Sequence, residues 1–377
     1  MTELRELLAE RIRAQGPVTF AEYMAEALYH PELGYYSAGP ERSGWRGDFV
    51  TSAELDPAFG ELWCRFFDRV WRACGQPERF ELVEIGPGEG AFAHSVLSSA
   101  TGGFERALGV RLIEPLPVLR ARQARRLGAA RVTWSASLDE TPGAECGCVF
   151  ANEVLDNQPV HLVQRRNGEL AEGWVDADND GLELVWRAPS TPELEAHLRR
   201  LGIELPEGHA FEVGLAAASL VRRAAKVLRR GVLVLVDYGM EGPDLLARPS
   251  GSLATYSDTG VDALVLERPG AKDITVHVDW TSVGGTLEDA GLSRLGPLPQ
   301  RSVLRDLGLG DLDRRLRDSF DAASARGSGA AALRSMSRRQ ALAVLADPAG
   351  LGALGVMMGL KGVDASDVLL HEKEPGT

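Results

Sequence analysis

The 377-residue sequence predicts an α/β fold: a doubly wound parallel sheet with N-terminal helices and an inserted α+β substrate region. Three observations predict it. From residue 80 onward there are five short apolar runs of strand length, with segments of helical periodicity between most of them. A glycine-rich turn joins the first of these runs to the helix that follows it. Hairpin-like sequences then interrupt the alternation between the fourth and fifth runs.

The segment before the first predicted strand is expected to be helical. Leucines at helical spacing predict a first helix over 4–12. Thr19, with Glu22 three residues later, is a capping-box pattern that predicts the start of a second helix. Asp56 followed by Pro57 predicts the start of a third. We expect the apolar stripe of this third helix to pack in the core: Phe59, Leu62, Trp63, Phe66, Phe67, Val70 and Trp71.

The alternating part of the chain yields five strand candidates, which are 80–85, 109–114, 131–134, 146–151 and 232–237. A later run, 273–280, alternates cleanly and predicts a further strand, whereas 302–346 is Arg-rich and predicts covering helices. We therefore divide the chain into five parts: an N-terminal helical and lid region (1–78), the first half of the cofactor-binding fold (79–160), the insertion (161–215), the second half (216–300), and C-terminal helices with a tail (301–377).

Composition excludes several classes of function. The net charge of −13 argues against the nucleic-acid backbone as a main partner, and no apolar run approaches the roughly 20 residues of a membrane span. The first residues fit neither a signal nor a transit peptide. The four cysteines show no zinc spacing, so we expect free thiols, no metal and a cytoplasmic location. A protein substrate and a homodimer are both compatible with the sequence.

The glycine-rich turn is the strongest indication of a ligand. Gly86, Gly88 and Gly90 allow the tight turn and the close approach of a cofactor to the main chain. Glu84, just before the turn, suits a cationic or hydroxyl-rich ligand. S-adenosylmethionine has a sulfonium, an ammonium and a ribose, so the G-x-G-x-G turn predicts a site for this cofactor. Because Gly86, Gly88 and Ala91 also satisfy G-x-G-x-x-A, a nicotinamide-dependent dehydrogenase is an alternative.

Polar residues follow the other predicted strands, where ligands of open α/β sheets bind. Glu114 follows the second strand and can accept hydrogen bonds from both ribose hydroxyls. Ser137 follows the third and would hold the adenine amine. Asn152 and Glu153 end the fourth, and a dehydrogenase has little use for this pair. We therefore expect Asn152 to border the cofactor as well.

Carboxylates near the fourth strand are the candidate catalytic groups. Methyl transfer is an in-line displacement that depends mostly on positioning and desolvation. If the nucleophile is a guanidinium nitrogen, a carboxylate must orient it, and Glu153 or Asp156 could do so. Asp156 could instead cap the following helix or turn. Asp48 lies in a polar loop with no helix to cap, and His277 is either a base or a hydrogen-bonded structural residue.

The chain also resembles the MidA family in long motifs that occur in the same order, from about residue 20 to beyond residue 280. The motifs are at 47–52, 84–90, 151–156, 237–239 and 269–279. The resemblance implies a class I S-adenosylmethionine-dependent methyltransferase fold. Mitochondrial members of that family are protein arginine methyltransferases that assist assembly of respiratory complex I. By the same resemblance, Gly86, Gly88 and Gly90 line the cofactor, and the motifs containing Asp48 and Glu153 border the active site.

The sequence departs from the family in one segment. Where family members usually carry a basic residue and a histidine, residues 252–260 have neither. The expected function is thus a protein methyltransferase with arginine or another nitrogen as acceptor. A small-molecule methyltransferase and a cofactor-binding assembly chaperone without catalysis are the alternatives.

Overall fold

The computed structural model describes residues 2–37, 51–128, 131–178, 181–257 and 260–369. The chain forms two compact units, each assembled from three stretches of sequence. The first, here called the accessory unit, comprises 1–49, 153–222 and 238–286. The second, the sheet unit, comprises 50–152, 223–237 and 287–377.

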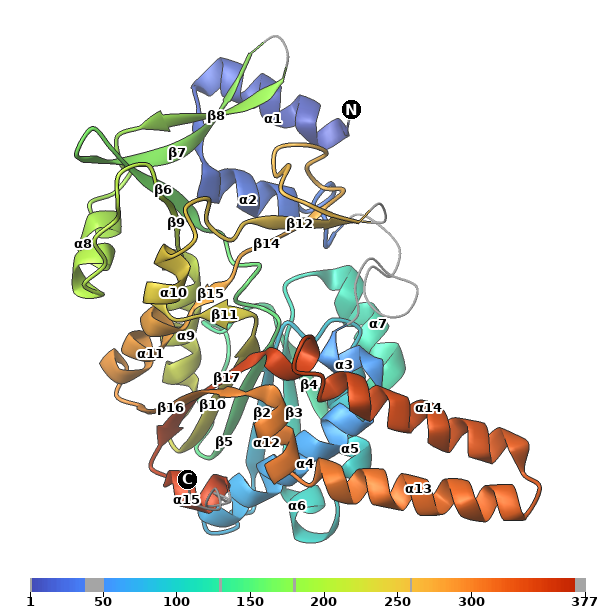
Figure 1. Cartoon of the computed structure of the whole chain (residues 1–377). Coiled ribbons are helices and arrows are strands. Elements are labelled where there is room, and N and C mark those ends of the chain that lie inside the picture. Colours follow the sequence, from blue (N-terminus) through green and yellow to red (C-terminus); the bar gives the residue numbers. More distant parts are fainter. Residues whose placement is uncertain (1, 38–50, 129–130, 179–180, 258–259, 370–377) are drawn as a thin grey trace. The chain divides into compact units, whose positions relative to one another are not determined.

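The sheet unit is built on a seven-stranded sheet with the order β16-β17-β10-β5-β2-β3-β4 (Figure 1). Five parallel strands form most of it: β2 (Phe80–Ile85), β3 (Leu108–Ile113), β4 (Val132–Ser135), β5 (Gly147–Asn152) and β10 (Gly231–Asp237). All five lie within one residue of the predicted strands, so those predictions are confirmed. The strand order reverses between β2 and β5, the type of position where open α/β sheets bind ligands.

Two strands of this sheet were not predicted. β17 (Gly355–Lys361) lies between β10 and β16 (Ser293–Pro299) and is antiparallel to both. Every residue of β17 except Lys361 is buried. A strand buried on both faces reads as a short apolar run without alternation, which periodicity alone does not identify as a strand. It also follows a long helical segment, so the sequence indicated only helices and a tail there.

Aromatic residues from α4 (Ala58–Ala73) fill the core of the sheet unit, as the sequence predicts. The side chains of Phe59, Trp63 and Phe67 are fully buried. Phe92, from α5 (Ala91–Ser99), stacks on Phe150 of β5 with ring centroids 4.3 Å apart. This burial of apolar area holds the two helices on the sheet. The remaining helices of this unit are α3 (Ser52–Leu55), α6 (Gly102–Ala107), α7 (Pro117–Leu127), α12 (Gln300–Asp306) and α15 (Ala365–Val368), with the 3-10 helix η1 (Leu351–Ala353).

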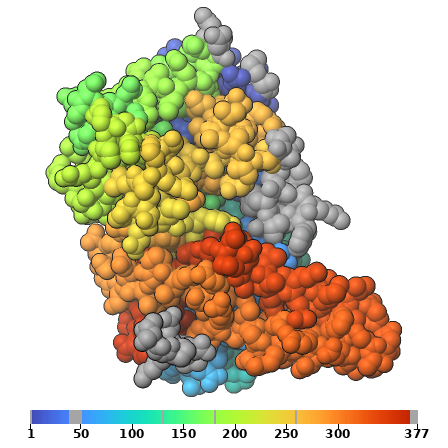
Figure 2. Space-filling model, viewed as in Figure 1, coloured from blue at the N-terminus to red at the C-terminus, as the bar shows by residue number. Residues whose placement is uncertain are grey.

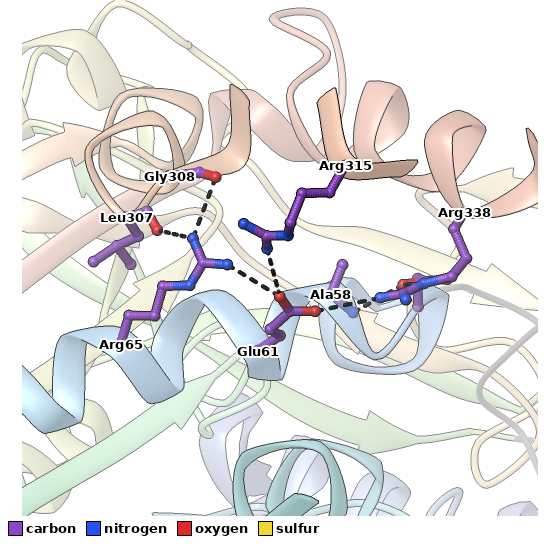
Figure 3. Close-up of polar contacts among 8 residues, drawn as sticks. Ala58, Glu61, Arg65, Leu307, Gly308, Arg315 and Arg338 are labelled. Atoms are coloured by element: carbon purple, nitrogen blue, oxygen red, sulfur yellow. Dashed lines mark hydrogen bonds and ion pairs between the residues drawn. The ribbon is translucent and has the colours of Figure 1, made fainter. Parts of the chain in front are cut away.

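A helical hairpin, α13 (Leu309–Ala325) and α14 (Gly329–Leu345), projects from the sheet unit as a ridge (Figures 1 and 2). Figure 3 shows how charged residues join it to α4. Glu61 accepts hydrogen bonds from Arg65 at 3.0 Å, from Arg315 at 3.1 Å and from Arg338 at 3.5 Å. Arg65 also donates to the carbonyl of Leu307 at 2.9 Å. One carboxylate therefore joins arginines from three helices.

The accessory unit contains an antiparallel sheet of order β1-β7-β6-β9, with β8 paired to β7. Its elements are α1 (Glu3–Gln15), β1 (Val18–Thr19), α2 (Phe20–Tyr29), β6 (His161–Arg166), β7 (Glu169–Ala177), β8 (Leu182–Arg187), α8 (Glu193–Arg200) and β9 (Ala210–Val213). The predicted capping box is confirmed: Thr19 N–H donates to the Glu22 carboxylate at 2.8 Å, and Glu22 N–H donates to Thr19 Oγ1 at 3.1 Å. Helix α9 (Leu215–Val227) continues from this unit into the sheet unit.

The predicted continuous strand over 273–280 is wrong. It is divided into β14 (Asp273–Thr275), β15 (Val278–Asp279) and the start of α11 (Trp280–Asp289). Three successive backbone N–H groups in this stretch donate to three different segments: Val276 to the Asp156 carbonyl at 3.0 Å, His277 to Ser252 Oγ at 3.0 Å, and Val278 to the Tyr238 carbonyl at 2.8 Å. A continuous β-strand needs its backbone groups to pair with one neighbouring strand, and these three N–H groups pair with three different segments. The other short elements are β11 (Gly239–Met240), α10 (Gly242–Leu246), β12 (Ala254–Ser257) and β13 (Gly260–Asp262).

Within the ranges that the structure describes, no helix is long and apolar enough to span a bilayer. In the same ranges, no group of three or more His, Cys, Asp or Glu side chains is arranged to hold a metal ion.

Candidate functional site

The glycine turn after β2 has the backbone conformation that only glycine adopts at little cost. Gly86, Gly88 and Gly90 have φ values of 64°, 50° and 77°. A Cβ on Gly90 would lie 3.2 Å from Leu127 Cδ1, so this glycine lets α5 and α7 pack closely. A Cβ on Gly88 would have only Glu54 Oε1, at 3.8 Å, within 4 Å. Gly88 therefore leaves room for a ligand, and Gly90 is required by helix packing.

Glu84 is a buried carboxylate at this turn. The side chain is 5% exposed, and its Oε2 has no hydrogen-bond partner among the described residues. Burial raises the pKa of Glu84 to about 8. A buried acid with a free oxygen is costly unless a ligand supplies a donor. The ammonium of S-adenosylmethionine is such a donor, so this residue fits the predicted cofactor.

Glu114, immediately after β3, is the second buried acid of the site and is 4% exposed. Its Oε1 accepts a hydrogen bond from Leu116 N–H at 2.8 Å, and its Oε2 accepts one from Gln123 Nε2 at 3.3 Å. Burial raises the pKa of Glu114 to about 7, although both hydrogen bonds oppose that shift. Each oxygen keeps a further lone pair, so the carboxylate is held in place and still able to accept from ribose hydroxyls.

Ser137 and Asn152 complete the predicted cofactor set. Ser137 is half-buried beyond the end of β4, and its Oγ accepts a hydrogen bond from Glu140 N–H at 3.4 Å. Asn152 is the half-buried last residue of β5 and pairs with Val236 of β10. The structure thus brings all the predicted cofactor residues to the carboxyl ends of neighbouring strands in the sheet unit.

Two further residues of this edge were missed by the sequence reasoning. Gln123 on α7 contacts both the glycine turn and Glu114, and Glu54 on α3 lies beside Gly88. Gln123 lies among arginines and belongs to no sequence motif. That it faces the sheet becomes clear only from the structure, which shows how α7 is rotated about its axis. Glu54 lies two residues beyond the 47–52 motif, which is its one indication in the sequence.

Glu153 has an unusual backbone for its residue type. It directly follows β5 and has a φ of 53°, in the left-handed region that non-glycine residues rarely adopt. Its side chain is half-buried. Such strain costs of order 1–3 kcal/mol and occurs preferentially at functional sites. The conformation turns the chain sharply where the sheet unit ends and the accessory unit begins again.

Asp156 is buried in a turn of the accessory unit, 6% exposed. No helix follows it, since the next element is β6, so the prediction that it caps a helix is wrong and only a turn remains. Asp156 and Asp273 both contribute, after burial, to a pKa of Tyr36 well above 10. Tyr36 donates to Asp273 Oδ1 at 3.0 Å, and so does Asn157 Nδ2 at 3.0 Å. Asp48, the third predicted catalytic residue, lies outside the described residues.

A small cavity of about 30 Å³ lies in the accessory unit, and Glu212, His277 and Asp279 are among the residues that line it. Among the described residues, neither His277 Nδ1 nor Asp279 Oδ2 has a hydrogen-bond partner. Burial raises the pKa of Asp279 to about 6; burial and then the charge of Arg248 lower the pKa of His277. The cavity is large enough for a water molecule bonded to these groups. In the part of the chain that the structure describes, the Nδ1 of His277 therefore lacks the protein partner that a structural role would give it.

Comparisons with known proteins point to one chemistry. Residues 62–298 match the sequence model of the family described as "Putative S-adenosyl-L-methionine-dependent methyltransferase". The chain is 29% identical over 355 residues to "Protein arginine methyltransferase NDUFAF7, mitochondrial" of Mus musculus, covering 86% of this chain and 77% of that protein. It is 30% identical to the Danio rerio protein of the same name, covering 80% and 76%. A crystal structure from Burkholderia thailandensis, bound to S-adenosyl-homocysteine, is 30% identical with a TM-score of 0.83, covering 97% of this chain and 94% of that one.

Proposed function

The chain belongs to this family of S-adenosyl-L-methionine-dependent methyltransferases, and we propose that it methylates a nitrogen of a protein side chain, with arginine as the acceptor. The family, the class I methyltransferase fold, the enzyme class and the cofactor predicted from the sequence are confirmed. The dehydrogenase alternative is thereby excluded. The acceptor is the part that we propose.

The cofactor supplies an electrophilic methyl group on its sulfonium. We place its ammonium at Glu84, its ribose hydroxyls at Glu114 and its adenine amine near Ser137. The Oε2 of Glu84, which has no partner in the described part of the chain, and the open space at Gly88 support this placement. In this arrangement the glycine turn excludes water from one side of the cofactor, and both carboxylates are anchored on the sheet before binding. Preorganisation of this kind reduces the cost of binding.

Three observations support arginine as the acceptor. The relatives from Mus musculus and Danio rerio are named protein arginine methyltransferases. Carboxylates are the side chains that orient a guanidinium, because they accept two parallel hydrogen bonds from it. Glu153 carries most of the argument, because a glutamate takes a left-handed backbone at a strand end, where glycine or asparagine would cost less. We assign Glu153 to orienting the attacking nitrogen, with Asp156 and Asp48 as further candidates.

We also propose a cytoplasmic location, which the four free cysteines support. In a small-molecule methyltransferase, the segment 252–260, which lacks the basic residue and histidine usual in the family, would border a different acceptor pocket. The experiment below distinguishes the two acceptors.

Glu153→Gln tests the proposal, because it keeps the shape of the side chain and removes its charge. Methyl transfer into lysate protein should fall by roughly 10²-fold or more, and affinity for S-adenosylhomocysteine should stay within a factor of about three. Glu145→Gln, the same substitution at an exposed carboxylate paired with Arg229, is the matched control and should leave both quantities unchanged. Parental transfer by Glu153→Gln would refute the assignment and leave Asp156 or Asp48. Transfer into small molecules alone would refute the protein acceptor.

A further inference from the structure

Gln123 is the buried residue of α7, a helix rich in arginine, and its side chain is 0% exposed. Its amide makes three hydrogen bonds. Nε2 donates to the Gly88 carbonyl at 2.8 Å and to Glu114 Oε2 at 3.3 Å. Oε1 accepts from Trp134 Nε1 at 3.0 Å. Both amide hydrogens and the amide oxygen are therefore used.

These three bonds join parts of the sheet edge that follow different strands. Gly88 belongs to the turn after β2, Glu114 follows β3, and Trp134 lies on β4. A buried amide costs free energy unless its polar atoms are all paired, and an apolar side chain would fill the same volume without that cost. The pairing of Gln123 therefore serves the groups that it contacts more than the packing of α7.

Two of the contacted groups need to be fixed if they are to bind a ligand. Gly88 has a φ of 50° and no side chain, so nothing of its own restrains the turn at this point. The carboxylate of Glu114 has two oxygens whose orientation must be fixed, and Leu116 N–H donates a hydrogen bond to only one of them. Gln123 restrains both groups through a single planar amide.

We propose that Gln123 is a positioning residue of the cofactor site, which fixes the Gly88 carbonyl and the Glu114 carboxylate relative to each other before the cofactor binds. This inference rests on the proposed placement of the cofactor against these two residues. Its consequence is that Gln123 contributes to cofactor affinity without touching the cofactor.

The same contact affects the ionisation of Glu114. A donor favours the charged form of a carboxylate, and the hydrogen bonds from Leu116 and Gln123 and the charge of Arg120 lower the pKa of Glu114, whereas burial and the charge of Glu89 raise it. Loss of the Gln123 donor should therefore move Glu114 toward its neutral form, which accepts hydrogen bonds from ribose less well. If Gln123 only filled space, its replacement would not shift the pH dependence of cofactor affinity.

The test uses two variants of the full chain and titration calorimetry with S-adenosylhomocysteine between pH 6 and 9. Gln123→Met keeps the length and removes all three bonds, and should weaken binding by about tenfold or more. Gln123→Glu keeps an acceptor for Trp134, removes both donors and adds a charge beside Glu114, so it should weaken binding further. In both variants the rise in affinity with pH should move to higher pH.

Two controls separate positioning from loss of stability. Leu316→Ala opens the core of the same unit on α13, and it should lower the melting temperature without changing affinity or its pH profile. In a Glu114→Ala background, Gln123→Met should weaken binding less than it does in the parental protein, because, of the two groups that Gln123 fixes, only the Gly88 carbonyl then loses its contact.

Parental affinity and pH profile in Gln123→Met would overturn the inference. If that variant does not fold, the same result in Gln123→Glu would overturn it. Should Glu114→Ala weaken binding while both Gln123 variants bind normally, only this inference fails. Should Glu114→Ala also bind normally, the proposed placement of the cofactor fails with it.

Discussion

Replacement of Glu84 by glutamine should change stability and cofactor affinity in opposite directions. Glu84 is 5% exposed, and burial raises its pKa from 4.5 to about 8. Glutamine has nearly the same shape and is neutral at every pH. The substitution therefore removes the cost of a buried charge and also removes the partner that we propose for the cofactor ammonium.

The sign of the stability effect follows from proton binding. Between pH 4.5 and about 8 the folded chain keeps the Glu84 proton and the unfolded chain has lost it, so the free energy of unfolding falls as pH rises through this window. The ceiling for this loss is about 5 kcal/mol, since each pKa unit corresponds to about 1.4 kcal/mol. Water entry and local relaxation reduce such penalties, and we expect roughly 2 kcal/mol.

Urea denaturation of the parental protein and Glu84→Gln at pH 5, 7 and 9 measures this directly. The variant should be the more stable protein at pH 9, and the difference should shrink toward pH 5. The parental protein must be compared with the variant because Glu114 and Asp279 also have raised pKa values. These two residues therefore also contribute to the change of the parental free energy of unfolding with pH. Calorimetry should show binding of S-adenosylhomocysteine weakened by about 1.5–3 kcal/mol in the variant, with fewer protons released on binding. The role given to Glu84 would be refuted if the free energy of unfolding changed with pH equally in both proteins and the affinity for S-adenosylhomocysteine were unchanged.

Three further substitutions test other parts of the account. Glu114→Ala should weaken S-adenosylhomocysteine binding by about 1.5–3 kcal/mol in calorimetry, and unchanged affinity would mean that the acid after β3 does not hold the cofactor. Gly88→Val should abolish binding, because a β-branched residue is strained at a φ of 50° and would fill the open space at the turn; a folded variant that binds normally would contradict this. Glu61→Ala should lower the free energy of unfolding by about 1 kcal/mol in urea denaturation, since three arginines lose their shared acceptor. Glu195→Ala, which removes an exposed pair with Arg199, should cost less, and an equal cost would contradict the role of the Glu61 cluster.

The parallel core of the sheet could be predicted from the sequence because most of its strands are separated by helices and bounded by turn residues. β17 could not, because it pairs with β10 from more than a hundred residues away and its apolar run has no period of its own. The stretch 273–280 alternates like a strand, yet its backbone donors pair with three separate segments. Local pattern predicts an extended conformation there, whereas tertiary partners decide where each piece ends.

In the candidate site, too, some residues could be predicted from the local sequence and others depend on tertiary partners. The glycine turn, Glu84 and Glu114 could be predicted because each occupies a fixed place relative to a strand end. Gln123 could not, since its role depends on the rotation of α7 about its axis and on partners after three different strands. The strain at Glu153 is likewise a property of where the chain turns, and glutamate itself gives no indication of a left-handed backbone.

The central claim, transfer of a methyl group to arginine in a protein, is tested most directly by amino-acid analysis of labelled lysate. Lysate from a strain that lacks this chain is incubated with the purified protein and S-adenosylmethionine labelled in its methyl group. The account predicts label in methylarginine after acid hydrolysis of the protein fraction, and a loss of roughly 10²-fold with Glu153→Gln. Label confined to small molecules, or to a side chain other than arginine, would contradict it.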